Sequence, residues 1–99
     1  MPPVPRAPYD NPPPELARLG AAVRELREER GLKQIEAASG AGMTESQVSD
    51  IERGKNNPGW LLLCRLLVDG LEADLGDLAA AYERGDRKRD DPTPGQGRA

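Results

Sequence analysis

The 99-residue chain contains no histidine, no phenylalanine and a single cysteine, Cys64. One thiol excludes a disulfide within the chain, and no group of residues has the spacing of metal ligands. Catalytic pairs that need histidine are also excluded, and no glycine-rich phosphate loop follows a strand. We therefore expect a protein that is not an enzyme and binds no cofactor. Cys64 lies in an apolar run, which favours a buried structural thiol.

Aromatic residues make up only 3% of the chain, so its core must be built mainly from leucine and alanine. Such a core is small, and a domain of this size gains stability from a partner or a dimer. No apolar segment reaches the ~20 residues that a membrane-spanning helix needs. Together with the single cysteine, this pattern leads us to expect a cytoplasmic protein.

Basic charge is also scarce. The chain has 14 lysine and arginine residues against 17 aspartate and glutamate residues, which gives a net charge of −3. DNA-binding domains usually carry a basic surface, so this balance argues against nucleic acid as a partner. Binding depends, however, on the charge of the docking face rather than on the total. The overall charge therefore does not exclude DNA.

Prolines are concentrated at the start of the chain, where seven of the ten lie within residues 1–14. Proline fixes φ and removes a backbone donor, which predicts an extended, disordered arm. This arm can be interpreted as a flexible terminus or as a recognition arm for a partner or a DNA groove. Residues 86–99 are predicted to form a disordered charged tail. Residues 15–85 remain as one helical domain.

The best-specified segment is a pair of short helices near the middle of the chain. Thr44 and Gln47 have the spacing of a capping box at the start of the second helix, and Gly54 can end it. Gln34 opens the first helix, and Gly42 can adopt the positive φ of the turn between the two. Two short helices joined by a tight glycine-containing turn form a helix-turn-helix motif.

Two longer helices are expected on either side of this motif. Residues 15–29 are predicted to be helical because leucine and valine recur there at helical spacing. A second helix is predicted over residues 75–84, capped by Asp74 and stopped by Gly85.

A fourth helix in chain order is predicted from Trp60 to about Gly70, with Trp60 on its buried side. It is apolar nearly all round, so in a small domain one of its faces should meet another protein. The first interpretation is a homodimer contact around Leu61, Leu62 and Leu66. The alternative is that Trp60 and the N-terminal arm fold over this face.

The motif resembles the Cro/lambda-repressor-type (XRE) helix-turn-helix family over roughly residues 16–82. The residues that carry the likeness are Gln34, Ala38, Gly42, the run Ile51-Glu52-Arg53-Gly54-Lys55, and Pro58. The resemblance implies an all-α, five-helix, lambda-repressor-like domain that binds DNA and regulates transcription. It further implies a homodimer that inserts the helix near residues 45–53 into the major groove. An ion pair between Arg27 and Glu52 is also implied.

The family position of each residue gives the expected DNA contacts. Residues of the second motif helix are expected to face the bases: Glu45, Ser46 and Asp50, with Gln47 and Ser49 beside them. Residues at helix starts and after the motif are expected to approach phosphates: Gln34, Thr44, Arg53, Lys55 and Asn56.

Glu45 and Asp50 complicate this interpretation, because carboxylates repel phosphate and accept only from donors such as cytosine N4. If the two residues read bases, C·G pairs should lie opposite them. If they do not, the same surface would suit a basic or helical protein partner. The alternative function is therefore a protein-interaction module on the same fold, an antitoxin-like or adaptor subunit with little or no direct DNA readout.

Overall fold

The computed structural model describes residues 12–90, with side chains as far as Gly85, and contains five α-helices and one π-helical turn. The α-helices are α1 (Pro14–Glu29), α2 (Gln34–Ala41), α3 (Glu45–Glu52), α4 (Trp60–Arg65) and α5 (Leu75–Asp90), and the π-helical turn is η1 (Leu66–Gly70). No strand occurs in the described part of the chain, so the all-α prediction is confirmed.

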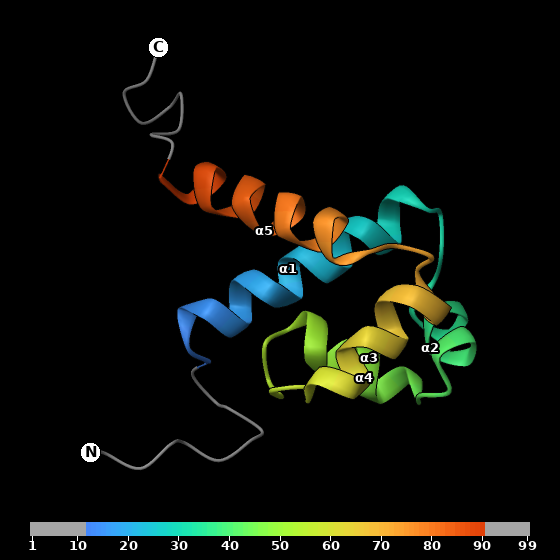
Figure 1. Ribbon diagram of the computed structural model, residues 1–99. Coiled ribbons are helices and arrows are strands. Elements are labelled where there is room, and N and C mark those ends of the chain that lie inside the picture. The colour runs from blue at the N-terminus through green and yellow to red at the C-terminus, as the bar shows by residue number, and fades with distance from the viewer. Residues whose placement is uncertain (1–11, 91–99) are drawn as a thin grey trace.

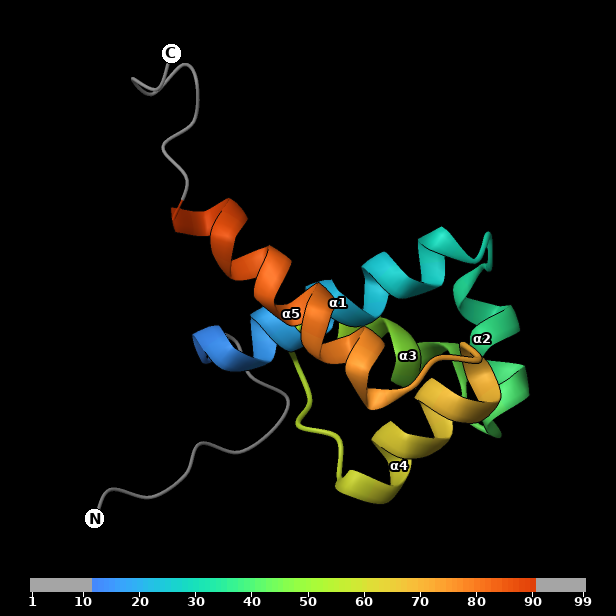
Figure 2. The same cartoon turned by 45° about the horizontal axis from the view of Figure 1, so that its top comes forward.

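The long helices α1 and α5 pack against each other, and the shorter elements gather beside them (Figure 1). α3 packs against α1 and α2, while η1 packs against α2 and continues from α4. Figure 2 shows the same arrangement after rotation, with α4 at the lower edge of the molecule and α3 between it and α1. α3 is therefore held by two other helices.

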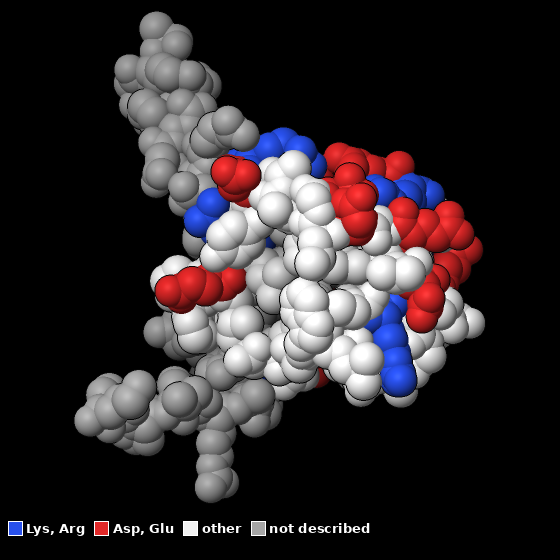
Figure 3. All heavy atoms as spheres, viewed as in Figure 1, with Lys and Arg blue, Asp and Glu red and all other residues white. Residues whose placement is uncertain are grey.

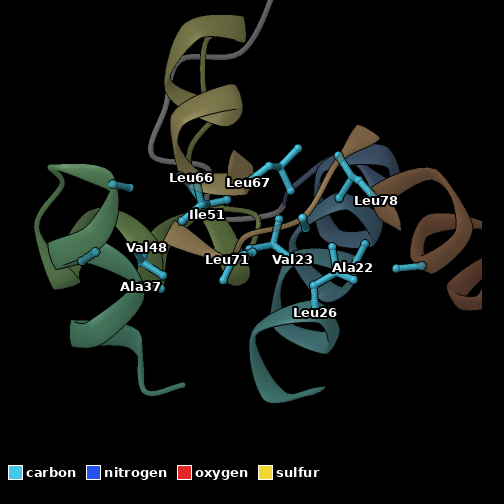
Figure 4. Close-up of a cluster of buried hydrophobic side chains, with 14 residues drawn as sticks. Ala22, Val23, Leu26, Ala37, Val48, Ile51, Leu66, Leu67, Leu71 and Leu78 are labelled. Carbon is cyan, nitrogen blue, oxygen red and sulfur yellow. The ribbon is translucent and has the colours of Figure 1, made fainter. Parts of the chain in front are cut away.

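The core consists of short aliphatic side chains from all parts of the bundle, and these converge in one cluster (Figure 4). The largest fully buried side chains are Leu26, Leu66, Leu67, Leu71, Val23 and Val48. Alanines fill much of the remaining interior: Ala22, Ala37, Ala38, Ala41, Ala73 and Ala81. The expectation of a core made from leucine and alanine is confirmed.

Small residues let the helix backbones approach closely. A Cβ atom placed on Gly20 of α1 would lie 2.4 Å from the carbonyl oxygens of Ile51 and Glu52 at the end of α3. A Cβ atom on Gly70 would lie 2.7 Å from the carbonyl oxygen of Ala37. Because real Cβ atoms do not approach backbone oxygens so closely, only glycine allows these contacts.

The sequence predicts one continuous α-helix from Trp60 to about Gly70, but the structure does not have one. After six residues the backbone widens into η1, where the backbone N–H of Leu71 donates to the carbonyl of Leu66 at 2.9 Å. The i→i+5 hydrogen bonds of a π turn change which side chains share a face. In this segment Leu66 is fully buried, whereas Trp60 at the start of α4 is 64% exposed. The prediction that Trp60 faces the core is wrong, and Leu66 cannot contribute to a dimer surface.

The start of α5 is capped as predicted. The backbone N–H of Asp77 donates to the Asp74 carboxylate at 2.8 Å, and the N–H of Asp74 donates to the Asp77 carboxylate at 3.1 Å. These reciprocal bonds satisfy backbone donors that a helix start would leave unpaired.

The end of α5 differs from the prediction, because the helix continues through Gly85 to Asp90. Just before Gly85, Arg84 Nε donates to the Glu25 carboxylate of α1 at 2.7 Å, a bond that links α5 to α1. One glycine inside a helix costs only about 1 kcal/mol, which such packing can offset. Residues 86–90 therefore belong to a helix, while the disorder predicted for residues 1–11 and 91–99 lies outside the described residues.

The contact at Gly20 gives a prediction for stability. Gly20→Ala should lower the free energy of unfolding by about 1–3 kcal/mol, because the added Cβ meets backbone oxygens that cannot move aside cheaply. Gly85→Ala is the matched control: its Cβ meets nothing closer than Arg18 Cγ at 3.8 Å. The control should gain up to about 1 kcal/mol from better helix propensity. Urea unfolding followed by circular dichroism measures both, and a Gly20→Ala variant as stable as the control would contradict the close approach.

Candidate nucleic-acid interface

A tight turn joins α2 to α3. Gly42 has a left-handed φ of 71°, and the backbone N–H of Met43 donates to the carbonyl of Ala38 at 2.9 Å. The predicted capping box then starts α3: Thr44 Oγ1 accepts from the N–H of Gln47 at 3.1 Å, and Gln47 Oε1 accepts from the N–H of Thr44 at 2.9 Å. These bonds fix the direction in which α3 leaves the turn.

α3 has one buried face and one polar, outward face. Val48, Ile51 and Glu52 are buried, whereas the first turn, Glu45 to Gln47, is exposed. Among the described residues Glu45 has no ion-pair partner. The helix therefore presents its N-terminal turn to solvent.

The end of α3 is anchored by a buried carboxylate. Glu52 accepts two hydrogen bonds from the Arg27 guanidinium of α1, at 2.6 Å from Nε and 3.1 Å from Nη2. The side chains are only 11% and 3% exposed, and the implied ion pair is confirmed. The hydrogen bond to Glu52 raises the pKa of Arg27 above its ordinary value, which keeps the guanidinium charged.

Gln34 also belongs to this anchor, which the sequence did not reveal. Its Nε2 donates to Glu52 Oε1 at 3.0 Å, so its side chain points to the end of α3. The start of α2 therefore lies near the C-terminal end of α3. The α3 helix is about 12 Å long at 1.5 Å per residue. We refer to the contacts among Arg27, Gln34 and Glu52 as the Glu52 anchor.

The loop after α3 is tied back to the helix by Asp50. One carboxylate oxygen accepts from Arg53 Nη2 at 2.8 Å, and the other accepts from Asn56 Nδ2 at 3.1 Å. The backbone carbonyl of Asp50 accepts from the N–H of Lys55 at 2.8 Å. Asp50 and Arg53 have helical spacing in the sequence, but nothing in the sequence marks Asn56 as a partner.

The structure brings the expected DNA contacts together on α2, α3 and the loop that follows. The exposed members are Thr44, Glu45, Ser46, Gln47, Arg53 and Lys55, and the half-buried members are Gln34, Ser49, Asp50 and Asn56. Gln34 and Asp50 have side chains occupied by other protein groups. The most accessible polar groups therefore lie on the first turn of α3 and in the loop.

No helix in residues 12–90 has the length and apolar character required to span a membrane. In the same range, no three histidine, cysteine, aspartate or glutamate side chains are grouped as they would be around a metal ion.

Two short helices joined by a glycine turn, with a capped, outward-facing second helix, define a helix-turn-helix domain. Residues 18–91 match the family model described as a helix-turn-helix domain. The chain belongs to this family, and its expected likeness to Cro/lambda-repressor-type proteins is confirmed. Membership of this family also confirms the prediction that the chain is not an enzyme.

A curated relative comes from Bacillus phage phi105. The chain is 39% identical over 51 residues to its ImmF control region 10 kDa protein, a match that covers 52% of this chain. The chain thus aligns with 57% of the length of that relative.

Solved structures of regulators share the fold. The restriction-modification controller protein C.Esp1396I has a TM-score of 0.70 at 21% identity, covering 77% of this chain and 97% of its own. The clp gene regulator ClgR from C. glutamicum has a TM-score of 0.68 at 25% identity, with 78% and 97% covered. The controller protein C.AhdI from Aeromonas hydrophila has a TM-score of 0.61 at 31% identity, with 65% and 96% covered.

The Glu52 anchor gives a second prediction. Arg27→Ala should lower the free energy of unfolding by about 3 kcal/mol, because it leaves the Glu52 carboxylate buried without its cation. Arg24→Ala is the control, since the Arg24–Glu28 pair is 63% and 55% exposed. An exposed pair contributes at most about 1 kcal/mol, so this variant should stay close to wild type. Equal losses for the two variants in urea unfolding would show that the anchor adds nothing beyond a surface pair.

Proposed function

We propose that the chain is a sequence-specific DNA-binding transcriptional regulator that inserts α3 into the major groove. The observation that carries this function is the fixing of α3 at both ends, by the Thr44–Gln47 capping box and by the Glu52 anchor. A helix held in this way can present its exposed polar turn to base edges in one orientation. Family membership and the regulatory relatives support the same function.

We expect the first turn of α3 to make the base contacts. Ser46 can donate to or accept from a base edge, and the side-chain amide of Gln47 still carries N–H donors while its oxygen serves the cap. Glu45 can accept from cytosine N4, which would place a C·G pair opposite it. These three exposed residues lie at the end of α3 that enters the groove.

We expect the phosphate contacts to come from the helix starts and the loop on either side of the exposed face of α3. The start of α2, near the end of α3, and the start of α3 itself would face phosphates on the two sides of the groove. Backbone N–H groups at such helix starts donate to phosphate oxygens. The exposed cations nearby are Lys33, Arg53 and Lys55, and Arg53 is shared with Asp50. Exposed Glu36 and Glu45 and half-buried Asp50 balance these three cations, so the local charge is close to zero and the expected affinity for DNA is modest.

We further propose a homodimer through α4 and η1. Trp60, Leu61 and Val68 are 64%, 63% and 60% exposed, so three large apolar side chains lie in solvent within nine residues. Figure 3 shows a largely uncharged face over the part of the molecule where Figure 1 draws α4. Burial of such side chains favours association by about 25 cal/mol per Å². A two-fold pair would set its two α3 helices about 34 Å apart, one turn of DNA.

The alternative function, an antitoxin-like or adaptor module, is favoured by the exposed Glu45 carboxylate at the tip of α3, which repels phosphate. A basic partner would bind this carboxylate. The two functions differ in the effect of Glu45→Gln, which should strengthen binding to DNA in general but weaken binding to a basic partner.

The DNA-binding function predicts that the purified chain enriches a short palindrome from a random DNA pool. Fluorescence anisotropy on that fragment should show affinity falling steeply with salt, with a log–log slope of about −4 to −5 if each copy neutralises two or three phosphates. A scrambled fragment is the control and should bind more weakly. A folded protein that enriches no fragment at low salt would rule out direct readout.

The dimer predicts that Leu61→Glu shifts the protein toward monomer in sedimentation velocity at increasing concentration, because a buried charge opposes association. Ile35→Glu is the matched control: Ile35 is also an exposed apolar residue, at 51%, but it lies on α2. The control should associate as the wild type does. A wild type that stays monomeric at every concentration would contradict the dimer.

A further inference from the structure

We propose that Asp50 is a positioning residue, which orders the loop after α3 for phosphate contact and does not read a base. Each oxygen of its carboxylate accepts from a side chain beyond the helix, Arg53 at 2.8 Å and Asn56 at 3.1 Å. Its backbone carbonyl accepts from the N–H of Lys55 at 2.8 Å. Asp50 therefore holds three of the four residues from 53 to 56. This role rests on the proposed DNA-binding function.

The chemistry of the carboxylate supports positioning over readout. A base reader must be free to turn its lone pairs toward the groove, but Arg53 and Asn56 each bond one oxygen of Asp50 and so hold the carboxylate toward the loop. The bond from Arg53 is charge-assisted and therefore among the stronger kinds. Asp50 is also 26% exposed at its side chain, whereas Glu45 lies in the open first turn of α3.

The loop held by Asp50 carries groups that suit phosphate. Lys55 is exposed, and its backbone is fixed by the Asp50 carbonyl while its side chain extends into solvent. Asn56 is half-buried, with its side-chain amide directed to Asp50. A lysine on an ordered loop contacts phosphate with less loss of entropy than a lysine on a loop free to move.

Two roles for Asp50 predict effects of opposite sign on DNA affinity. If Asp50 were only a negative charge near DNA, its removal would strengthen binding by reducing repulsion of phosphate. If Asp50 orders the loop, its removal weakens binding even though the protein becomes more basic. Glu45, which has no ion-pair partner among the described residues, supplies the matched comparison, since Glu45→Ala removes the same charge from the same helix without touching the loop.

The experiment measures Kd by fluorescence anisotropy for the wild type, Asp50→Ala, Asn56→Ala and Glu45→Ala, each on the selected palindrome and on its scrambled form. Asp50→Ala should weaken binding to both fragments by about tenfold and reduce the salt slope by about 2, because each copy of the dimer loses one phosphate contact. Glu45→Ala should strengthen binding to the scrambled fragment. Asn56→Ala should act in the same direction as Asp50→Ala, and the double variant should lose less than the two single losses combined.

A readout without DNA tests the positioning itself. In the free protein, ¹⁵N relaxation should show greater mobility at residues 55–57 in Asp50→Ala than in wild type or Glu45→Ala. Asp50→Ala should remain folded, because its partly exposed ion pair contributes little to stability.

Three results would overturn the role of Asp50 while the wild type still binds its palindrome. The first is that Asp50→Ala binds DNA more strongly than the wild type. The second is that Asp50→Ala loses affinity only for the palindrome, with an unchanged salt slope. The third is that the mobility of residues 55–57 is the same in Asp50→Ala and the wild type. A loss of affinity for the palindrome alone would identify Asp50 as a base reader. A wild type that binds neither fragment is a different result, because it contradicts the proposed function.

Discussion

The buried carboxylate of Glu52 is the interaction on which the placement of α3 depends. A buried charge is costly unless donors surround it, and here the donors come from Arg27 of α1 and Gln34 of α2. The anchor works only if α1 lies close to the end of α3, which Gly20 permits by leaving room for the carbonyls of Ile51 and Glu52. Close backbone packing and the ion pair therefore require each other, and together they set the angle of α3.

The charge of the chain is distributed so that an acidic protein can present a usable DNA surface. Two carboxylates of α3 are engaged within the protein: Glu52 is buried in the anchor, and Asp50 is bound by Arg53 and Asn56. Glu45 alone among the α3 carboxylates stands exposed without an ion-pair partner in the described structure. The net charge of −3 thus says little about the field at the groove.

Residue spacing within short segments predicted the features that depend on neighbouring residues, such as the helix caps. The capping box at Thr44 and the Asp74 cap of α5 followed from residue spacing, and the Arg27–Glu52 pair followed from family resemblance. The sequence could not reveal the Asp50–Asn56 bond or the donation from Gln34, because each depends on how separate segments pack. Which residues touch DNA stays a prediction, since positions on a surface do not identify contacts.

The packing of η1 against α2 affects which apolar side chains are exposed next to α4. Gly70 lies against the Ala37 carbonyl and Gly40 lies against that of Asp69, so α2 and η1 meet backbone to backbone. A continuous α-helix would have kept a period of 3.6 residues to Gly70, but the backbone widens from Leu66 onward, where Leu66 and Leu67 are buried and Val68 is exposed. The apolar surface available to a second copy consequently differs from the one that helical periodicity predicts. In the proposed dimer this surface would set the spacing of the two α3 helices, so the packing of η1 against α2 would also bear on the half-site spacing.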